Sequence, residues 1–504
     1  MKFETLKLRT EILETLNEMG FEEPTPIQQE AIPHAIEGKD IIGQAQTGTG
    51  KTAAFGLPML NKLTNDTQYI QGLVVTPTRE LAIQVQEELF KLGKGQRARV
   101  HVVYGGSPIG KQIDRLQKNR PHILVGTPGR LLDLIHRNVL NLAHLQTLVL
   151  DEADEMLNMG FIEDIKAIIS ATPQERQTLL FSATMPPAIK ALGSQFLQDP
   201  IHVKIKANHV TSDLIEQFFV KCRDDEKFDM LTRFIEVQNP TQAIVFCRTK
   251  KRVDEVGRGL SLRGFNAEMI HGDITQQKRT QVIKEFKNKT LEILVATDVA
   301  ARGLDISGVT HVYNYDITQD PESYVHRIGR TGRAGADGMS ITFVINNEMS
   351  YLRTIEELTR KEMTPLAPPT DKEAQRGQVV HLMERISENI ENGNVDRYRN
   401  VAKQMLEHYE VNDVLSALIN EIITDSTEVQ VDISPQKPLP NANKGHQRSG
   451  GRGGSRGRSN NRRGGQGSGS RRQGKMSEGG KGRSSRSSES RPAKSSGNFK
   501  IKKK

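Results

Sequence analysis

Residues 40–52 of the chain are Asp40-Ile-Ile-Gly-Gln-Ala-Gln-Thr-Gly-Thr-Gly-Lys-Thr52. A short apolar run leads into a glycine-bearing loop, and a helix can begin at the residues that follow. A strand that continues through a loop into a helix is the first half of a β-α-β unit. This stretch therefore predicts an α/β fold.

The same alternation extends outward along the chain. Short apolar runs recur between amphipathic stretches such as 80–94 and 130–136, which predicts strands separated by helices. Strands connected in this way form a parallel sheet with helices on both faces. A polar stretch near residue 210 interrupts the pattern, which then resumes, so we expect two tandem, doubly wound α/β domains. The predicted strands are 40–43, 72–76, 122–126, 147–150 and 178–181, and then 243–246, 267–270, 292–295, 311–313 and 340–345.

The last third of the chain has a different composition. Residues 372–425 place apolar side chains at spacings of three and four, which predicts amphipathic helices. Residues 441–504 carry 19 Lys and Arg against 2 Asp and Glu and are rich in Gly and Ser, so they cannot bury enough apolar surface to fold alone. We therefore expect four regions: α/β domains at 1–208 and 209–366, a small helical domain at 367–428, and a disordered basic tail at 429–504.

Composition excludes several classes of protein. A length of 504 residues suits about three domains. Two cysteines, Cys222 and Cys247, are too few for a disulfide scaffold or a four-cysteine zinc site. The N-terminal residues mix acidic with apolar side chains, unlike a secretory signal, and no stretch approaches about 18 apolar residues. We expect a soluble, cytoplasmic protein that has no membrane partner.

Residues 45–52 resemble the phosphate-binding loop GxxxxGK[ST], with Ala45 in place of the first glycine. The backbone N–H groups of such a loop, and of the helix after it, surround phosphates. The motif places Lys51 at the β- and γ-phosphates and Thr52 on Mg²⁺. A chance Gly-Lys-Thr turn is the alternative for this motif taken alone.

Asp151-Glu-Ala-Asp154 follows the apolar run 147–150. An acid at the end of a strand in the same domain suits a carboxylate, here Asp151, that holds Mg²⁺ through water. Glu152 would then polarise the attacking water as general base. A solvated acidic turn is the alternative. In company with the phosphate loop, the acids predict hydrolysis of a nucleoside triphosphate.

In these motifs and their order, residues 1–366 resemble the DEAD-box RNA helicases of superfamily 2. The resemblance implies two RecA-like domains, with ATP and Mg²⁺ as cofactors. Thr25-Pro-Ile-Gln28 resembles the Q motif of the family, in which Gln28 recognises adenine and Phe21 packs near the base. The implied ATP-binding residues are Phe3, Phe21, Thr25, Gln28, Ala45, Gln46, Thr47, Gly48, Thr49, Gly50, Lys51, Thr52, Gly303, Asp305, Arg330 and Arg333.

The second domain has no phosphate loop but ends in His326-Arg-Ile-Gly-Arg330-Thr-Gly-Arg333, which resembles motif VI. The resemblance implies that Arg330 and Arg333 approach the γ-phosphate as arginine fingers, joining Lys51, Asp151 and Glu152 as catalytic residues. A basic surface loop is the alternative for an arginine pair alone. Because these groups are split between two domains, we expect ATP and RNA to close the domains before hydrolysis.

A coupling role is implied for a further set of residues. Ser182-Ala-Thr184 resembles the family motif whose hydroxyls bond to the acids and link hydrolysis to strand separation; a turn that caps the next helix is the alternative. The coupling set is Asp154, Ser182, Thr184 and His326.

Other motifs lie at predicted strand ends and carry hydroxyls, arginines and glycines, which are phosphate-contacting groups. RNA as the ligand comes from the resemblance alone. The motifs contain no aromatic side chain and the chain has no Trp, which favours a grip on the RNA backbone over reading of its bases. The implied RNA-binding residues are Thr78, Arg79, Gly105, Gly106, Thr127, Arg130, Gly272, Arg279 and Thr297.

The helical region resembles the extension of the Gram-positive bacterial cold-shock DEAD-box helicases, in which it forms a homodimer. A monomeric helical cap on the second domain is the alternative. The basic tail would hold RNA without sequence choice or serve only solubility. We therefore expect an RNA helicase whose RNA-stimulated ATP hydrolysis separates short duplexes in cold adaptation, RNA degradation or ribosome assembly. A nucleotide-gated RNA clamp and an RNA chaperone acting through the tail are the alternatives.

Overall fold

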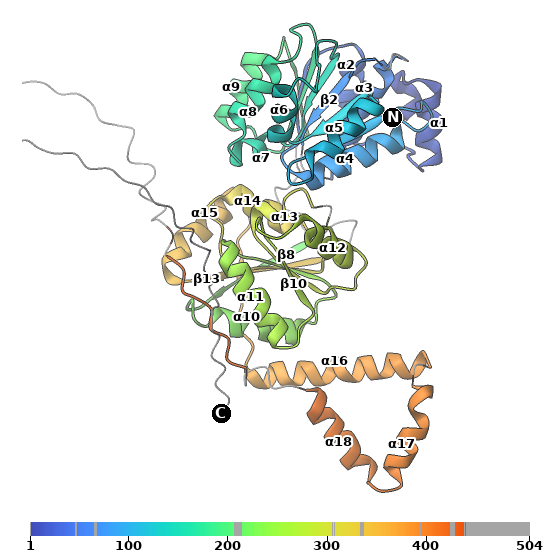
Figure 1. The fold of residues 1–504 in the computed structure, drawn as a ribbon. Helices are drawn as coiled ribbons and strands as arrows, with labels where there is room; N and C mark the ends of the chain where they lie inside the picture. Colours follow the sequence, from blue (N-terminus) through green and yellow to red (C-terminus); the bar gives the residue numbers. More distant parts are fainter. Residues whose placement is uncertain are drawn as a thin grey trace, which may run out of the picture. The chain divides into compact units, whose positions relative to one another are not determined.

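The computed structural model describes residues 2–45, 48–64, 68–205, 214–304, 306, 308–332, 337–393, 395–423, 429–437 and 439. Its two α/β domains each contain a parallel seven-stranded sheet (Figure 1). The strands of the first sheet are β1 (Ile41–Gln44), β2 (Gly72–Val75), β3 (Val100–Val103), β4 (Ile123–Gly126), β5 (Thr147–Leu150), β6 (Gln177–Ser182) and β7 (Ile201–Lys204). The expected pair of doubly wound parallel sheets is confirmed.

The second sheet repeats the first. The spatial order is β3-β4-β2-β5-β6-β1-β7 in one sheet and β10-β11-β9-β12-β13-β8-β14 in the other, which is the same order with each strand number raised by seven. The strands of the second sheet are β8 (Ile215–Lys221), β9 (Ala243–Phe246), β10 (Ala267–Ile270), β11 (Ile293–Ala296), β12 (His311–Asn314), β13 (Gly338–Val344) and β14 (Thr364–Pro365).

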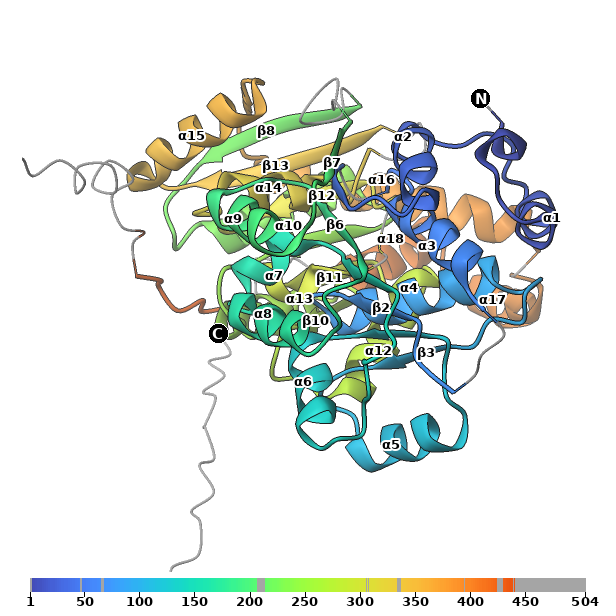
Figure 2. The same cartoon turned by 90° about the horizontal axis from the view of Figure 1, so that it is seen from above.

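Helices cover both faces of the first sheet (Figure 2). Alternate residues of its strands pack against two separate sets of helices, because successive side chains of a strand point to opposite faces. One set is α1 (Thr10–Glu18), α2 (Pro26–Ile36), α3 (Lys51–Lys62) and α4 (Arg79–Leu92). The other is α5 (Ile109–Lys118), α6 (Pro128–His136), α7 (Ala153–Asn158), α8 (Ile162–Ser170) and α9 (Pro187–Phe196).

The second sheet is covered in the same way. The helices α10 (Lys227–Gln238) and α11 (Lys250–Leu262) pack on one face. On the other face lie α12 (Gln276–Lys287) and α13 (Asp298–Ala301), with a further apolar cluster built by α14 (Pro321–Ile328) and α15 (Met349–Thr359). Short 3₁₀ turns occur at Phe3–Leu6, Asn346–Glu348 and Asp396–Tyr398.

The sequence pattern missed four strands: β3, β7, β8 and β14. Three of them lie at sheet edges and β8 is next to an edge. Polar residues interrupt the apolar pattern of the longer missed strands: β3 reads Val-His-Val-Val, β7 reads Ile-His-Val-Lys and β8 begins Ile-Glu-Gln.

The helical region consists of α16 (Asp371–Glu391), α17 (Arg399–Leu406) and α18 (Val411–Ile422), which form the three sides of a triangle in Figure 1. The first half of α16 packs on α10, where Arg233 pairs with Asp371 at 2.7 Å and Gln378 donates to Glu236 at 2.6 Å. In α17 and α18 no described residue is buried.

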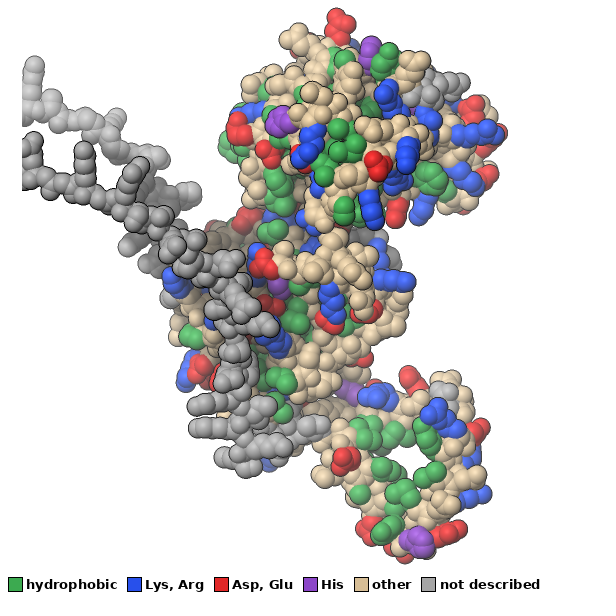
Figure 3. Space-filling view, in the orientation of Figure 1, with side chains coloured by type: hydrophobic (Ala, Val, Ile, Leu, Met, Phe, Trp, Pro, Cys, Tyr) green, Lys and Arg blue, Asp and Glu red, His purple; other side chains and the backbone are tan. Residues whose placement is uncertain are grey.

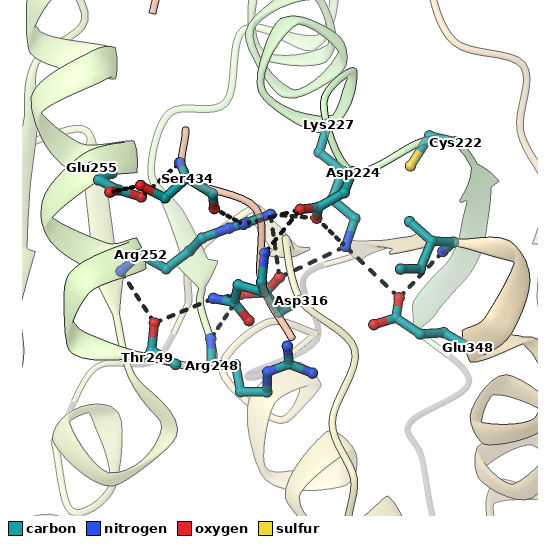
Figure 4. Close-up of polar contacts among 12 residues, drawn as sticks. Cys222, Asp224, Lys227, Arg248, Thr249, Arg252, Glu255, Asp316, Glu348 and Ser434 are labelled. Carbon is teal, nitrogen blue, oxygen red and sulfur yellow. Dashed lines mark hydrogen bonds and ion pairs between the residues drawn. The ribbon is translucent and has the colours of Figure 1, made fainter. Parts of the chain in front are cut away.

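Residues 429–437 are packed on the second α/β domain, which corrects the expectation that the tail begins at 429. Arg252, only 1% exposed, donates to Ser434 O at 2.8 Å, and the Ser434 hydroxyl pairs with Glu255 at 2.7 Å (Figure 4). Val431 and Ile433 pack against the core. The alternation Val429-x-Val431-x-Ile433 was the overlooked signal, because one side of an extended chain can bury such residues.

Both cysteines are free thiols in the second domain. Burial raises the pKa of Cys222 to about 11, and it also raises the pKa of Cys247. Among the described residues, no helix is long and apolar enough to cross a membrane.

Candidate functional site

The loop after β1 leads into α3 through Gly50, which has a φ of +91°. A Cβ at Gly50 would lie 2.4 Å from Gln28 Nε2, so only glycine fits this place. Gln28 donates from Nε2 to Gly50 O at 3.1 Å and accepts at Oε1 from Thr25 N at 2.9 Å. The start of α2 is therefore bonded to the predicted phosphate loop. Phe3 and Phe21 meet edge to face, with ring centroids 6.3 Å apart.

The other described residues of the predicted phosphate loop lie between β1 and the first turn of α3. Ala45 is buried, Gly48 has a positive φ, and Thr52 lies in the first turn of α3 behind Lys51. Thr49 lies between the two glycines. Gln46 and Thr47 lie outside the described residues.

Lys51 has a buried ammonium group with no hydrogen-bond partner among the described residues. Its charge acts on Asp151, the residue directly after β5. Burial raises the pKa of Asp151 to about 7, and the charge of Lys51 opposes this rise. The Lys51 ammonium therefore needs an acceptor, and the buried Asp151 carboxylate is suited to a cation. A nucleotide phosphate would supply the acceptor and Mg²⁺ the cation, so these residues fit both groups.

Glu152 adopts a left-handed conformation, with a φ of +51°. Such a conformation is costly for a residue with a side chain, and it is found often at functional sites. Glu152 N donates to Asp151 Oδ1 at 3.0 Å, so the turn also holds the carboxylate of Asp151 in place.

Asp154 connects the acidic motif to the hydroxyl motif after β6. Its Oδ2 accepts from Thr184 N at 2.8 Å and from Thr184 Oγ1 at 2.9 Å. Its own N–H donates to Ser182 Oγ at 3.3 Å. The structure therefore brings together Asp154, Ser182 and Thr184, three members of the predicted coupling set.

The fourth member, His326, reaches the same motif from the second domain through Glu155, which the sequence analysis did not single out. Glu155 Oε1 lies 3.0 Å from His326 Nδ1, and Oε2 lies 2.7 Å from Arg302 Nη1. Burial lowers the pKa of His326, but the hydrogen bond and charge of Glu155 outweigh burial and raise it. Glu155 directly follows the predicted acidic motif 151–154, and its side chain is only 3% exposed. A buried carboxylate indicates a functional or pairing role, but burial can be seen only in the three-dimensional structure.

The predicted RNA-binding residues lie just beyond the carboxyl ends of strands. Thr78 caps α4 by accepting from Leu81 N at 3.2 Å, and Thr297 caps α13 through Ala300 N at 3.3 Å. Thr127 precedes α6, and Gly272 is the second residue after β10 and lies beside Lys250. Such caps leave other N–H groups of each helix start free for anions.

Two of the predicted RNA-binding arginines also join the domains. Arg79 donates to Gln276 at 2.9 Å, and Arg279 pairs with Glu80 and donates to Ala300 O at 2.7 Å. A Cβ on Gly106 would meet the guanidinium of Arg79 at 2.3 Å, which explains a glycine there; Gly105 precedes it. Arg130 donates to Ser107 O at 3.0 Å, so it supports the same loop.

Of the four second-domain residues predicted to contact the nucleotide, the structure describes Gly303 and Arg330. Arg330 donates to Leu304 O at 2.6 Å, within its own domain. Gly303 lies beside Thr78, whose Oγ1 would be 2.0 Å from a Cβ at Gly303. The structure therefore gives Gly303 a neighbour in the predicted RNA set, where the resemblance implied the nucleotide. Asp305 and Arg333 lie outside the described residues.

Comparison with known proteins agrees with this geometry. Residues 25–192 match the DEAD/DEAH box helicase family, and residues 226–335 match the helicase conserved C-terminal domain. The chain is 58% identical to the ATP-dependent RNA helicase CshA of Limosilactobacillus reuteri, over 88% of this chain and 89% of that protein. It is 51% identical to the DEAD-box ATP-dependent RNA helicase CshA of Bacillus subtilis, over 91% and 94%.

A solved structure is similar in fold and sequence. S. cerevisiae Dbp5 bound to RNA and ADP BeF3 matches with a TM-score of 0.67 and 33% identity, covering 75% of this chain and 98% of that one.

Proposed function

This chain belongs to the DEAD-box ATP-dependent RNA helicases, and from that premise we propose that its two α/β domains convert ATP hydrolysis into local separation of RNA duplexes. One observation carries the proposal. The acidic motif after β5 is bonded through Asp154 to Thr184 and through Glu155 to Arg302 and His326 of the second domain. A change at the hydrolytic acids therefore alters the contacts that hold the domains together.

Lys51 would bind the β- and γ-phosphates, since its buried ammonium has donors to spare. Thr52 and, through water, Asp151 would hold Mg²⁺, which neutralises charge on the phosphates when bound. The buried, protein-bonded amide of Gln28 would set the distance between adenine and the phosphate loop.

Glu152 would accept a proton from the attacking water, and Arg330 and Arg333 would stabilise the charge that develops on the γ-phosphate. Because Arg330 donates to Leu304 O in this structure, its finger role requires the guanidinium to turn from that carbonyl toward the nucleotide. Closure by ATP and RNA would supply the turn.

RNA would lie along the hydroxyls, glycines and arginines at the strand ends. Thr78, Thr127 and Thr297 each stand at the start of a helix, where N–H groups favour phosphate oxygens. The basic residues at 441–504 would add binding without sequence choice. We propose that this work takes place in the cytoplasm, in cold adaptation, RNA degradation or ribosome assembly; the similarity to bacterial RNA helicases supports the cytoplasmic location.

The test is ATP hydrolysis by the full chain with and without single-stranded RNA. We expect strong stimulation by RNA, its loss in Glu152→Gln, and its retention in Glu163→Gln, a matched change at an exposed glutamate of α8. Weak hydrolysis that RNA does not stimulate, despite tight RNA binding, would instead favour the nucleotide-gated clamp.

We also propose that α16–α18 form a homodimer. Apolar side chains gather on these helices (Figure 3), and the exposed ones include Met383, Ile386, Ile390, Val401, Met405, Leu415, Leu418 and Ile422. An apolar surface of this extent suits a protein interface. Light scattering at several concentrations should give a dimer mass that Ile386→Asp halves and Ser387→Asp preserves. A monomer mass at every concentration would remove the dimer and favour the helical cap.

A further inference from the structure

A cavity of about 250 Å³ lies between the edge strand β3 and helix α5 of the first domain. Its floor contains His101 and Leu116, which are 4% and 5% exposed. Tyr104 and Ser107 form its walls, and Lys111 and Arg115 lie at its exposed rim. None of these six residues belongs to the predicted ATP, coupling or RNA sets.

His101 is a buried polar residue, and one of its ring nitrogens makes no hydrogen bond to the described residues. Its Nδ1 has no hydrogen-bond partner among the described residues. Burial, reinforced by the charges of Arg115 and Arg99, lowers the pKa of His101 to about 4. The ring is therefore neutral near pH 7, with one nitrogen that donates and one that accepts. A buried group of this kind normally has a partner, and the cavity is where a ligand can supply one.

The rim of the cavity is basic. Lys111 and Arg115 are four residues apart, so they lie on the same face of α5. No acidic side chain is among the lining residues; Asp114 of α5 lies off the cavity. A rim with two cations and no acid is suited to a phosphate group.

Tyr104 is the aromatic residue among those that line the cavity, whereas the predicted RNA-binding motifs contain none. The Gln112 side chain holds the backbone of Tyr104, accepting from its N–H at 3.2 Å and donating to its carbonyl at 3.1 Å. The next residues are Gly105 and Gly106, and Arg130 supports the far side of the loop through Ser107 O. The cavity is therefore continuous with a loop that we expect to contact RNA.

We propose that this cavity binds one nucleotide, with its base between Tyr104 and Leu116, its base edge hydrogen-bonded to His101, and its phosphate at Lys111 and Arg115. The inference rests on the proposed function, because the ligand would be a nucleotide of the RNA strand that passes Gly105 and Gly106. A free nucleoside monophosphate has the same chemistry and is the other source. Base–aromatic stacking and a basic groove are the usual means of holding single nucleotides.

The test is photocrosslinking of the full chain to an RNA oligomer that carries 4-thiouridine at one position at a time, with the crosslinked residue assigned by mass spectrometry. We expect a crosslink at Tyr104 or His101 from one position. Its yield should fall about tenfold in Lys111→Ser/Arg115→Ser, since these variants remove the two cations that would bind the phosphate and a charged contact contributes at least that factor to affinity. Lys118→Ser/Lys91→Ser, which removes two exposed charges outside the cavity, should preserve it. Equal melting temperatures of all variants show that the fold is kept.

A second arm identifies the source of the nucleotide. Uridine monophosphate is the probe, because a uracil base is not the one expected to fit beside Gln28. A shift of the His101 ring resonance with this probe, lost in Lys111→Ser/Arg115→Ser, together with no crosslink from RNA, assigns the cavity to a free nucleotide. Absence of both the crosslink and the shift overturns the inference.

These outcomes are distinct from failure of the proposed function. RNA crosslinks at Arg79 or Arg130 with RNA-stimulated hydrolysis intact would leave the helicase proposal standing even when the cavity binds nothing. If RNA does not stimulate ATP hydrolysis by the unaltered chain, the helicase proposal fails. The uridine monophosphate experiment would still test the cavity in that case.

Discussion

Glu155 Oε2 and Arg302 Nη1 lie 2.7 Å apart, although the two residues belong to different α/β domains. The other carboxylate oxygen lies 3.0 Å from His326 Nδ1. One buried carboxylate of the first domain thus pairs with two basic groups of the second, directly beside the acids that we assign to hydrolysis. This arrangement links the chemistry of one domain to the position of the other.

Replacing this carboxylate should weaken domain closure. Glu155→Gln keeps the size of the side chain but removes the charge that Arg302 and His326 face, which costs about 2 kcal/mol for a desolvated pair, or roughly 30-fold in the closed population. We expect RNA-stimulated turnover to fall while ATP binding is kept. Steady-state kinetics and nucleotide titration measure the two. Glu18→Gln, at an exposed ion pair with Lys94, is the control, and equal kinetics in both variants would contradict the linkage.

The contact of His326 with Glu155 also predicts a pH dependence. The pKa of His326 is raised, so the charged contact is fully present below the ordinary value of about 6.5 and is lost as pH rises through the raised value. Domain closure, followed by energy transfer between labels on the two domains, should weaken over that interval. In Glu155→Gln this dependence should flatten. An unchanged pH profile would show that His326 does not contribute.

The hydroxyl of Thr184 should matter more for strand separation than for hydrolysis. Thr184→Val removes the 2.9 Å bond to Asp154 Oδ2 but leaves the backbone N–H bond at 2.8 Å, so this oxygen keeps one partner. Glu155 N also donates to Asp154 Oδ1, at 3.2 Å, so the carboxylate stays bonded at both oxygens. We expect about 1 kcal/mol less stability and fewer duplexes separated per ATP. Thr172→Val loses a comparable bond, to Ile169 O, away from the acids. Parallel losses in both variants would argue against coupling through Thr184.

Replacing Gly50 should weaken nucleotide binding in addition to the stability cost of its left-handed backbone conformation. Gly50→Ala would cost about 1 kcal/mol for a left-handed φ and would also displace the Gln28 amide, only 2.4 Å from the new Cβ. Gly160→Ala imposes the same conformational cost at a place where the Cβ meets nothing within 4 Å. Melting temperatures should fall in both, whereas affinity for a fluorescent ATP analogue should fall only in Gly50→Ala.

Residues 429–437 should stabilise the second domain. A chain ending at 440 keeps the carbonyl that Arg252 bonds and the apolar contacts of Val431 and Ile433, so its melting temperature should match that of the full chain. A chain ending at 428 leaves the buried Arg252 short of a partner and should lose about 2 kcal/mol or more. Thermal unfolding of the two truncations decides, and equal midpoints would contradict a stabilising role.

Local patterns were enough to predict most of the architecture. Apolar runs separated by amphipathic stretches identified ten of the fourteen strands, because buried parallel strands are apolar on both faces. The phosphate loop and the acids could be assigned because each is a short segment at one strand end. Strands β3, β7, β8 and β14 and residues 429–437 were missed because none of them carries an uninterrupted apolar run of four residues.

The sequence by itself determined the two α/β domains, the residue types for ATP hydrolysis and the separation of those residues between domains, since each depends on neighbours along the chain. Only the tertiary structure decided that Glu155 faces Arg302 and His326, and that residues 429–437 cover Arg252. It also decided that His101 Nδ1 is buried with no hydrogen-bond partner among the described residues. These depend on burial and on contacts between distant segments. A carboxylate or an imidazole changes its role when folding removes it from water and selects its partners.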